Sequence, residues 1–533
     1  MSFSTLSEWH AIVGGQWIAA STGDWFEVSN PVNRSVVGRV ANCGAPEAEA
    51  ALAAAVQSFS DWSAQPPALR ATFLLRWLGL LEAHAEDLAQ LITRELGKTI
   101  RDSRAEVAYG NGYVRWFAEE ARRAYGTQIP SPVPGRQLLA MREPVGVVAV
   151  ITPWNFPYAM LARKIAPALA SGCTVLVRPA EDTPITALYM ARLAQEAGLP
   201  AGVLNVLPSS RSQVQVLTDV WMASDRVRKV SFTGSTPVGK GIAQRASATL
   251  KRLSLELGGN APFIVFDDAD LDAAVRGAVA AKFRNNGQTC VSPNRFMVQA
   301  GCYPAFVAKL TQAVSKLVVG EPSEATTDVG PLVNETAVGK VRRHVEDALA
   351  HGAELHLGGH ALDSQGPLYF QPTVLSGLTQ AMAIFREETF GPVIAVMPFT
   401  DEAHALALAN NTQAGLAGYF YALRMLPASG GSRGACKWVW SASTRRSSPP
   451  RSRLLGVSRI LVSAEKALIW GSMTTWRPST CAWAVWALDG HGRPCSIRGH
   501  YSAAIHAKSE RHRLFAPRNK RQQAQRACCP NYR

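Results

Sequence analysis

The spacing of apolar residues changes along the chain and predicts the order of its elements. Residues 12–42 alternate apolar and polar positions around turn residues, which predicts short antiparallel strands. Over residues 46–120 the apolar positions recur at helical spacing with few glycines or prolines, which predicts helices. From residue 145 onward, short and almost wholly apolar segments alternate with helical stretches, as in buried parallel strands joined by helices.

This alternation predicts an α/β protein with two doubly wound domains. The expected strands of the first sheet cover residues 145–151, 173–177, 203–207 and 229–232. Helices are expected among them, over residues 159–171 and 186–196. The pattern resumes with a strand over 261–265 and a helix over 271–283, which predicts the second domain.

Charge is distributed unevenly along the 533 residues. The formal net charge is +15, but 19 of the 55 Lys and Arg residues and only 3 of the 40 Asp and Glu residues lie after residue 424. The part before that point is therefore nearly neutral, which argues against a nucleic-acid partner for it.

The cysteines and the apolar runs bear on the compartment. The four cysteines before residue 425, Cys43, Cys173, Cys290 and Cys302, show no C-x-x-C spacing, so neither a zinc site nor a redox pair is expected. No signal-peptide pattern and no apolar run of membrane-spanning length is found. These features predict a cytoplasmic protein with no metal and no membrane partner.

Three polar positions are candidates for catalysis. Cys290 ends the segment Phe-Arg-Asn-Asn-Gly-Gln-Thr-Cys (283–290), whose polar residues suit a reactive thiol better than a buried apolar cysteine. Glu256, flanked by leucines, is a candidate general base, and an ion pair with Arg252 or Lys251 is the alternative. Asn155 follows a predicted strand in Trp-Asn-Phe-Pro (154–157) and is either an oxyanion donor or a turn residue.

These motifs resemble the aldehyde dehydrogenase superfamily over about residues 13–424, and most closely its succinate-semialdehyde dehydrogenases. The resemblance implies the aldehyde dehydrogenase fold. Its parts would be a coenzyme-binding domain (1–124 and 145–255), an oligomerisation hairpin (125–144) and a catalytic domain (256–424). It also implies a homodimer or homotetramer.

The resemblance implies a mechanism as well. Cys290 would attack an aldehyde to give a thiohemiacetal, with Asn155 and the backbone N–H of Cys290 binding the oxyanion. Hydride would then pass to a nicotinamide coenzyme, and Glu256 would activate the water that hydrolyses the thioester.

The coenzyme is expected where predicted strands end. A glycine turn at 232–239 opens a helix whose N–H groups suit a pyrophosphate, whereas Gly241 stands where a P-loop needs Ser or Thr. Glu181 would bind ribose hydroxyls and repel a 2′-phosphate, which favours NAD, but the fork of Arg178 favours phosphate, so NADP stays open. The resemblance assigns coenzyme binding to Trp154, Arg178, Pro179, Ala180, Glu181, Gly234, Ser235, Leu257, Glu388 and Phe390.

Two arginines bear on the substrate. Arg163 and Arg284 stand at positions similar to those that bind the distal carboxylate in succinate-semialdehyde dehydrogenases, and an ordinary ion pair is the alternative for each. The predicted activity is NAD(P)-dependent oxidation of succinate semialdehyde to succinate. The same chemistry on glutarate semialdehyde, or on an aliphatic or aromatic aldehyde, stays open.

The resemblance stops after about residue 424. Residues 425–533 form a basic tail with 6 of the 14 tryptophans and no periodicity. Read in another frame, the codons of 470–476 permit Gly-Ile-Asp-Asp-Tyr-Leu, which resembles the family's C-terminal signature, so we predict a frame shift near residues 423–426. If the tail is real, the family's pocket loop and intersubunit strand are missing, and poor solubility with weak or no activity is expected. An inactive relic and a nucleic-acid-binding tail are the alternatives.

Overall fold

The computed structural model of the chain describes residues 7–422, 487–488 and 494–495. Most of the tail that the sequence sets apart, and with it the predicted frame shift, lies outside the described residues. Within the tail, β19 (Ala487–Leu488) and β20 (Pro494–Cys495) pair antiparallel and belong to a separate unit.

The N-terminal region consists of short strands, which confirms the expectation from its alternating pattern. β2 (Ala11–Val13) and β3 (Gln16–Ile18) pair antiparallel around Gly14 and Gly15, whose φ angles of 59° and 81° suit a tight hairpin turn. β4 (Trp25–Ser29) and β5 (Val36–Ala41) form a second antiparallel pair, to which β1 (Glu8–Trp9) adds a parallel strand.

Four helices follow, as the helical spacing predicts: α1 (Ala45–Ala64), α2 (Pro67–Ala83), α3 (Ala85–Leu96) and α4 (Ile100–Ala121). The α3 helix ends at Gly97, which adopts the left-handed conformation with φ of 70°. The α4 helix is capped by Thr99, whose side chain accepts a hydrogen bond from the N–H of Asp102. The segment between these two helices is therefore short and fixed at both ends.

The first sheet has seven strands in the order β12-β11-β8-β9-β10-β2-β3. Its five parallel strands are β8 (Val147–Ile151), β9 (Thr174–Arg178), β10 (Leu204–Val206), β11 (Val227–Thr233) and β12 (Arg252–Glu256). The connecting helices are α5 (Ala159–Ala170), α6 (Pro184–Glu196), α7 (Val214–Ala223) and α8 (Thr236–Ser247). Because the chain winds outward from β8 in both directions, the carboxyl ends of β8 and β11 border the crevice where such sheets bind nucleotides.

The second sheet has six strands in the order β15-β16-β17-β14-β13-β18. The strands are β13 (Ala261–Val265), β14 (Pro293–Gln299), β15 (Glu354–Leu357), β16 (Thr373–Ser376), β17 (Val393–Phe399) and β18 (Tyr419–Tyr421), and only β15 runs antiparallel to its neighbour. The helices are α9 (Leu271–Phe283), α10 (Tyr303–Val314), α11 (Glu335–Ala350), α12 (Ala383–Arg386) and α13 (Glu402–Asn410). A second α/β sheet is thus present, as the sequence predicts.

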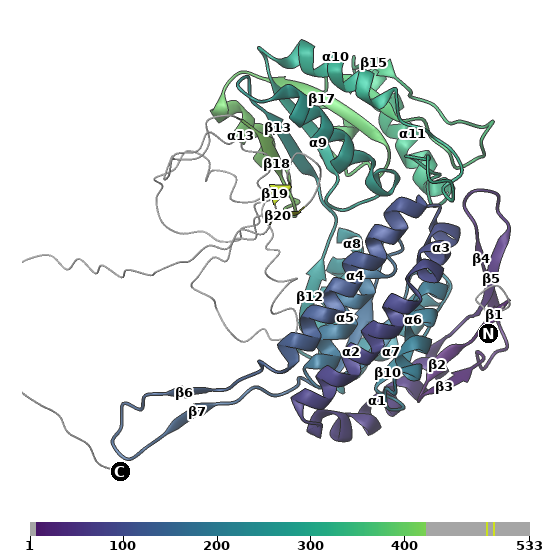
Figure 1. Cartoon of the computed structure of the whole chain (residues 1–533), viewed down its shortest axis with the longest axis vertical. Coiled ribbons are helices and arrows are strands. Elements are labelled where there is room, and N and C mark those ends of the chain that lie inside the picture. Colours follow the sequence, from purple (N-terminus) through teal and green to yellow (C-terminus); the bar gives the residue numbers. More distant parts are fainter. Residues whose placement is uncertain (1–6, 423–486, 489–493, 496–533) are drawn as a thin grey trace, which may run out of the picture. The chain divides into compact units, whose positions relative to one another are not determined.

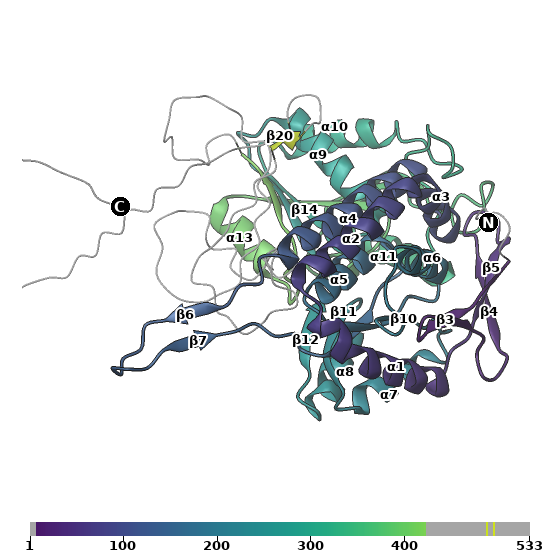
Figure 2. The ribbon, with the colours of Figure 1, turned by 60° about the horizontal axis from the view of Figure 1, so that its bottom comes forward.

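A two-stranded ribbon interrupts the first domain. β6 (Thr127–Ile129) and β7 (Leu138–Ala140) pair antiparallel and project away from the neighbouring helices in both views (Figures 1 and 2). Apolar side chains on it and beside it are exposed, with Leu139 67% and Met141 80% accessible. Its predicted role in oligomerisation stays a prediction. No helix among residues 7–422 combines the length and apolarity needed to cross a membrane.

Candidate active site

The loop that carries Cys290 is held by buried amides. It starts with the short helix η2 (Arg284–Gly287), where Asn285 and Asn286 are left-handed with φ of 51° and 56°. Asparagine tolerates this conformation better than most residues. The side chain of Asn286 donates to the carbonyls of Gly97 (3.1 Å) and Pro331 (2.8 Å), and its oxygen accepts from the N–H of Gly330. Cys290 therefore follows a segment of fixed geometry.

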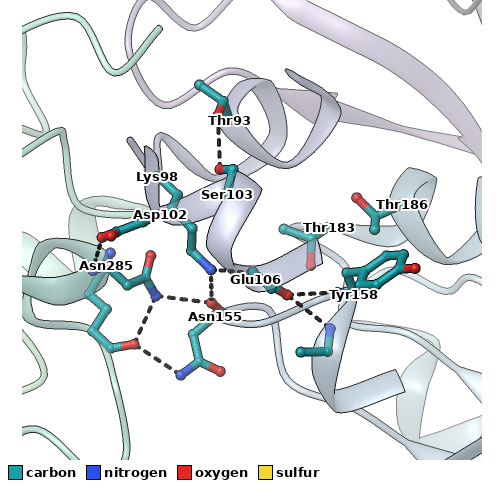
Figure 3. Close-up of polar contacts among 12 residues, drawn as sticks. Thr93, Lys98, Asp102, Ser103, Glu106, Asn155, Tyr158, Thr183, Thr186 and Asn285 are labelled. Atoms are coloured by element: carbon teal, nitrogen blue, oxygen red, sulfur yellow. Dashed lines mark hydrogen bonds and ion pairs between the residues drawn. The ribbon is translucent and has the colours of Figure 1, made fainter. Parts of the chain in front are cut away.

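Asn155 lies against this loop. It follows β8, is 5% exposed, and its Nδ2 donates to the carbonyl of Gln288 at 3.0 Å. Asn285 Nδ2 donates both to the same carbonyl (3.0 Å) and to the carbonyl of Asn155 (2.9 Å), as Figure 3 shows. The structure thus brings together the predicted oxyanion donor and the predicted nucleophile loop. Among the described residues, Asn155 Nδ2 donates one hydrogen bond, to Gln288, although an amide NH₂ can donate two.

Glu256 is the last residue of β12, and its carbonyl accepts from the N–H of Gly234 at 3.0 Å. Its carboxylate forms no ion pair with any residue that the structure describes. Lys251 instead donates to the carbonyls of Ser224 and Val227. The ion-pair alternative with Lys251 is therefore not what the structure contains, and the carboxylate acts electrostatically on Cys290.

The thiol of Cys290 is protonated in the free chain. Burial, followed by the negative charges of Glu388 and Glu256, raises the pKa of Cys290 to about 12, and the charge of Arg163 opposes this shift. A thiolate must therefore be generated before attack, since only the thiolate is strongly nucleophilic.

Glu388 and Phe390 approach the site from the segment before β17. Glu388 Oε1 accepts from the N–H of Gly259 at 3.0 Å, and burial raises the pKa of Glu388 to about 7. Phe390 has a φ of 59°, and its ring meets that of Trp154 edge-on at 5.5 Å. Trp154 and Phe390, both predicted to contact the coenzyme, are thus brought together.

The other predicted coenzyme residues lie at the ends of β9 and β11. Gly234 and Ser235 precede α8, whose N-terminus has no side-chain cap. A side chain at Gly239 would lie 2.4 Å from Leu257, so the helix packs closely on the predicted coenzyme contact Leu257. Thr233 Oγ1 is buried without a hydrogen-bond partner among the described residues. A free helix N-terminus beside an unsatisfied hydroxyl fits a dinucleotide phosphate.

Arg178 and Glu181 are already paired with each other. Arg178 Nη2 donates to Glu181 Oε2 at 2.7 Å, and its Nε donates to Ser209 Oγ at 3.0 Å. Arg211 Nε reaches Glu181 Oε1 at 3.2 Å. Burial raises the pKa of Glu181, but the charge of Arg178 and the hydrogen bonds outweigh this and lower it overall. The adjoining Pro179 and Ala180 are buried.

The two candidate substrate arginines contact aromatic rings. The guanidinium of Arg163, on α5, lies 5.3 Å from the ring centre of Tyr113, and that of Arg284 lies 5.0 Å from the ring centre of Phe156. Neither arginine forms a salt bridge with any of the described residues. The alternative interpretation, an ordinary ion pair for Arg163 or for Arg284, is therefore not found among the described residues.

Three polar residues of this region were not predicted from the sequence: Lys98, Glu106 and Arg211. Charged residues at helix ends and on helix faces are mostly exposed, so the sequence alone gave no reason to place Lys98 and Glu106 inside. Arg211 stands in a serine-rich loop that carries no recognised motif. In the described part of the chain, no group of three or more His, Cys, Asp or Glu side chains is arranged to hold a metal ion.

Comparison with known proteins agrees with this geometry. The sequence profile of the Aldehyde dehydrogenase family matches residues 17–429. The 3-sulfolactaldehyde dehydrogenase of Pseudomonas putida is 48% identical over 420 residues, which cover 78% of this chain and 85% of that protein. The NADP(+) succinate-semialdehyde dehydrogenase of Escherichia coli is 47% identical over 420 residues, covering 79% and 86%.

A solved structure extends the likeness to three dimensions. The crystal structure of succinate-semialdehyde dehydrogenase from Burkholderia pseudomallei superimposes with a TM-score of 0.77 at 47% identity, covering 79% of this chain and 86% of that one. The family profile spans more than half of the sequence. The two relatives are nearly half identical to this chain in sequence, and the solved structure has a similar fold. The chain therefore belongs to the aldehyde dehydrogenase family of NAD(P)-dependent oxidoreductases.

Proposed function

We propose that the chain oxidises succinate semialdehyde to succinate. The observation that carries the proposal is Arg163, a half-buried guanidinium that has no carboxylate partner among the described residues and whose charge acts on Cys290. An aldehyde with a carboxylate at its far end would place that carboxylate on Arg163, or on Arg284, while its carbonyl meets the thiol. The names of the relatives, succinate-semialdehyde and 3-sulfolactaldehyde dehydrogenase, also describe aldehydes with an acidic group.

The proposed reaction begins at Cys290. After its thiol proton has passed to solvent, the thiolate sulfur forms a bond to the aldehyde carbon while the carbonyl electron pair moves to the oxygen. Asn155 Nδ2 and the N–H of Cys290 donate to that oxygen, each such donor contributing about 3–4 kcal/mol in comparable sites. Trp154, Phe390 and Glu388 would hold NAD(P), which would supply the acceptor for the hydride of this carbon and so allow the adduct to become a thioester. Glu256 then removes a proton from water, whose oxygen attacks the thioester carbon, and the carbon–sulfur bond breaks to release the acid.

We propose that the ribose site accepts either coenzyme. Trp154, Phe390 and Glu388 would hold the nicotinamide end, and Gly234 with Ser235 would hold the phosphates. A free Glu181 would repel a 2′-phosphate, as the sequence predicts, but here two guanidinium groups contact it, at 2.7 Å and 3.2 Å. We therefore expect both NAD and NADP to be used, with a limited preference between them.

Assembly and compartment complete the proposal. We propose that the exposed apolar ribbon of β6 and β7 contacts a second copy of the chain, giving a dimer or tetramer. We place the reaction in the cytoplasm, because the four cysteines among residues 7–422 are free thiols.

The test compares aldehydes with and without the distal carboxylate. Arg163→Ala should lower kcat/KM for succinate semialdehyde about 10–100-fold more than for a neutral aldehyde of equal length, the range expected for a charge-assisted hydrogen bond. Loss of the Arg163 charge near Cys290 affects both aldehydes alike, so the difference between them measures the carboxylate contact. Arg284→Ala should show the same selectivity. Arg192→Ala, which removes a surface pair with Glu196, is the matched control. An equal fall for both aldehydes would overturn the assignment of the substrate. Glutarate semialdehyde in the same series measures how strictly chain length is read.

A further inference from the structure

We propose that Lys98 and Glu106 are positioning residues of the oxyanion site, because their buried ion pair fixes the main chain on both sides of Asn155. The inference deepens the proposed function, on which it rests for the role of Asn155. Neither side chain touches the position of the reacting atoms. Both act through the segment 155–159, which begins after β8 and ends at the first residue of α5. Figure 3 shows Lys98 and Glu106 beside Asn155 and Tyr158 of this segment.

Lys98 holds the first end of this segment. Its side chain is completely buried, forms a salt bridge with Glu106, and donates from Nζ to the carbonyl of Asn155 at 2.8 Å. The same ammonium lies 3.9 Å from the ring centre of Phe156. One cation therefore contacts the backbone of the oxyanion residue and the ring of the residue that follows it.

Glu106 holds the second end. Its Oε1 accepts from the N–H of Tyr158 at 2.9 Å and from the N–H of Ala159 at 3.1 Å. These N–H groups open α5 and have no partner within that helix, so a carboxylate from α4 replaces the missing N-cap. Because Glu106 also binds Lys98, a single ion pair fixes both Asn155 and the start of α5.

The same region of α4 also holds the nucleophile loop. Asp102 Oδ2 accepts from the N–H of Asn285 at 2.7 Å. The side chain of Asn285 donates to the carbonyls of Asn155 and Gln288. The carbonyl of Gln288 also accepts a hydrogen bond from Asn155 Nδ2. The start of α4 is thus a common support for the oxyanion donor and the loop that ends at Cys290.

Stability alone does not account for such a pair. The desolvation of two buried charges largely offsets their attraction, and apolar residues of similar volume often stabilise a core as well. The bonds of Lys98 and Glu106 are directional, however, and all of them end on segment 155–159 or on each other. A shift of about 1 Å in a catalytic group can cost about 10²-fold in rate, so fixing this segment has a direct consequence for Asn155.

A double-mutant cycle on the full chain tests the inference. Lys98→Met should lower kcat about 10–100-fold and change the KM for the aldehyde by less than about threefold. In an Asn155→Ala background the same substitution should cost less than about twofold, because the group it positions is already gone. Independent, multiplicative losses would overturn the inference. If Lys98→Met does not fold, a variant that carries both Lys98→Met and Glu106→Gln replaces it in the cycle. This variant removes both buried charges while nearly keeping the shape of the side chains.

Glu95 supplies a matched control. It is a buried carboxylate on α3 that accepts from the N–H groups of Ile185 (2.7 Å) and Thr186 (3.0 Å) at the start of α6, so it repeats the capping role of Glu106 without contacting Asn155 or Cys290. Glu95→Gln should change the unfolding transition but not kcat. If Glu95→Gln lowers kcat as much as Lys98→Met does, the effect is a general loss of stability and the inference fails.

A second measurement does not need turnover. Without coenzyme, an aldehyde that adds to Cys290 should protect this thiol from iodoacetamide, and Lys98→Met should weaken that protection about tenfold or more, as Asn155→Ala does. Unchanged protection in Lys98→Met beside weakened protection in Asn155→Ala would overturn the positioning role. Absence of protection in the unaltered chain would instead refute the proposed function.

Discussion

Replacing Gly259 by alanine should displace the nucleophile without touching any reacting group. Gly259 lies three residues after Glu256, and a Cβ atom there would be 2.2 Å from the carbonyl oxygen of Cys290. Its φ is not among the positive ones, so an alanine brings no backbone strain of its own. Because Cβ atoms essentially never approach another non-bonded heavy atom closer than 3.0 Å, Gly259 and Cys290 must move apart by about 1 Å.

The magnitude follows from that displacement. A shift of about 1 Å in the nucleophile is expected to lower kcat/KM about 10²-fold, equivalent to about 2.7 kcal/mol of transition-state stabilisation. The N–H of Gly259 also donates to Glu388, so movement on this side would change coenzyme binding as well. Aldehyde-dependent formation of reduced coenzyme measures the first effect, and coenzyme titration measures the second.

Gly112→Ala is the matched control. This glycine lies in the interior of α4, where an added Cβ meets nothing within 4 Å. Activity should be unchanged, and the free energy of unfolding should rise by about 0.5–1 kcal/mol, since glycine is unfavourable inside a helix. If Gly259→Ala retains activity within about twofold, or if both alanine variants lose it equally, the reasoning from close contact is refuted.

Three further predictions concern pH and coenzyme. Because the pKa of Cys290 is about 12, its alkylation in the free chain should accelerate about tenfold per pH unit from about pH 7 to 10, and a plateau near pH 8 would contradict this. Burial raises the pKa of Glu95 from 4.5 to about 7, so the stability it contributes is present below about pH 4.5 and lost as pH rises through about 7. In urea unfolding, the free energy of unfolding of Glu95→Gln relative to that of the unaltered chain should therefore be higher at about pH 8 than at about pH 5. The same relative value at both pH values would contradict this. Arg211→Ala should lower kcat/KM for NADP about tenfold more than for NAD, and parallel falls in steady-state assays would remove Arg211 from the coenzyme site.

The spacing of apolar residues located the elements well where a strand is buried on both faces or a helix is buried on one face. The strand at 261–265 and the helix at 271–283 coincide with β13 and α9, because a fully buried strand reads as an apolar run and a helix packed on one face reads as a 3.6-residue repeat. The short N-terminal strands were also recovered, since their turns carry glycines that need positive φ.

Polar contacts between distant segments could not be predicted in the same way. Lys98 and Glu106 are only eight residues apart, but both side chains are fully buried because their partners, Asn155, Tyr158 and Ala159, lie about 50 residues further along. Likewise, Arg178 and Glu181 gave opposite indications about the coenzyme as single residues. The structure shows that both Arg178 and Arg211 contact the carboxylate of Glu181. The negative charge of Glu181 is therefore already balanced by guanidinium groups, which neither residue reveals in the sequence.

The proposed chemistry depends on five segments that hold one another in place: 97–106, 154–159, 256–259, 285–290 and 388–391. Asn155 is bound to Gln288, Gly259 to Glu388, and Asn285 to Asp102, and all of these residues precede residue 423. The predicted frame shift concerns residues beyond that point. A chain whose Cys290 adds an aldehyde but fails to turn over would therefore keep segments 154–159 and 285–290 intact. Its defect would lie in a later step, either at Glu256, at the coenzyme contacts in 388–391 or outside these segments. A chain whose Cys290 does not react with aldehyde would have its defect within them, whatever the sequence of the tail.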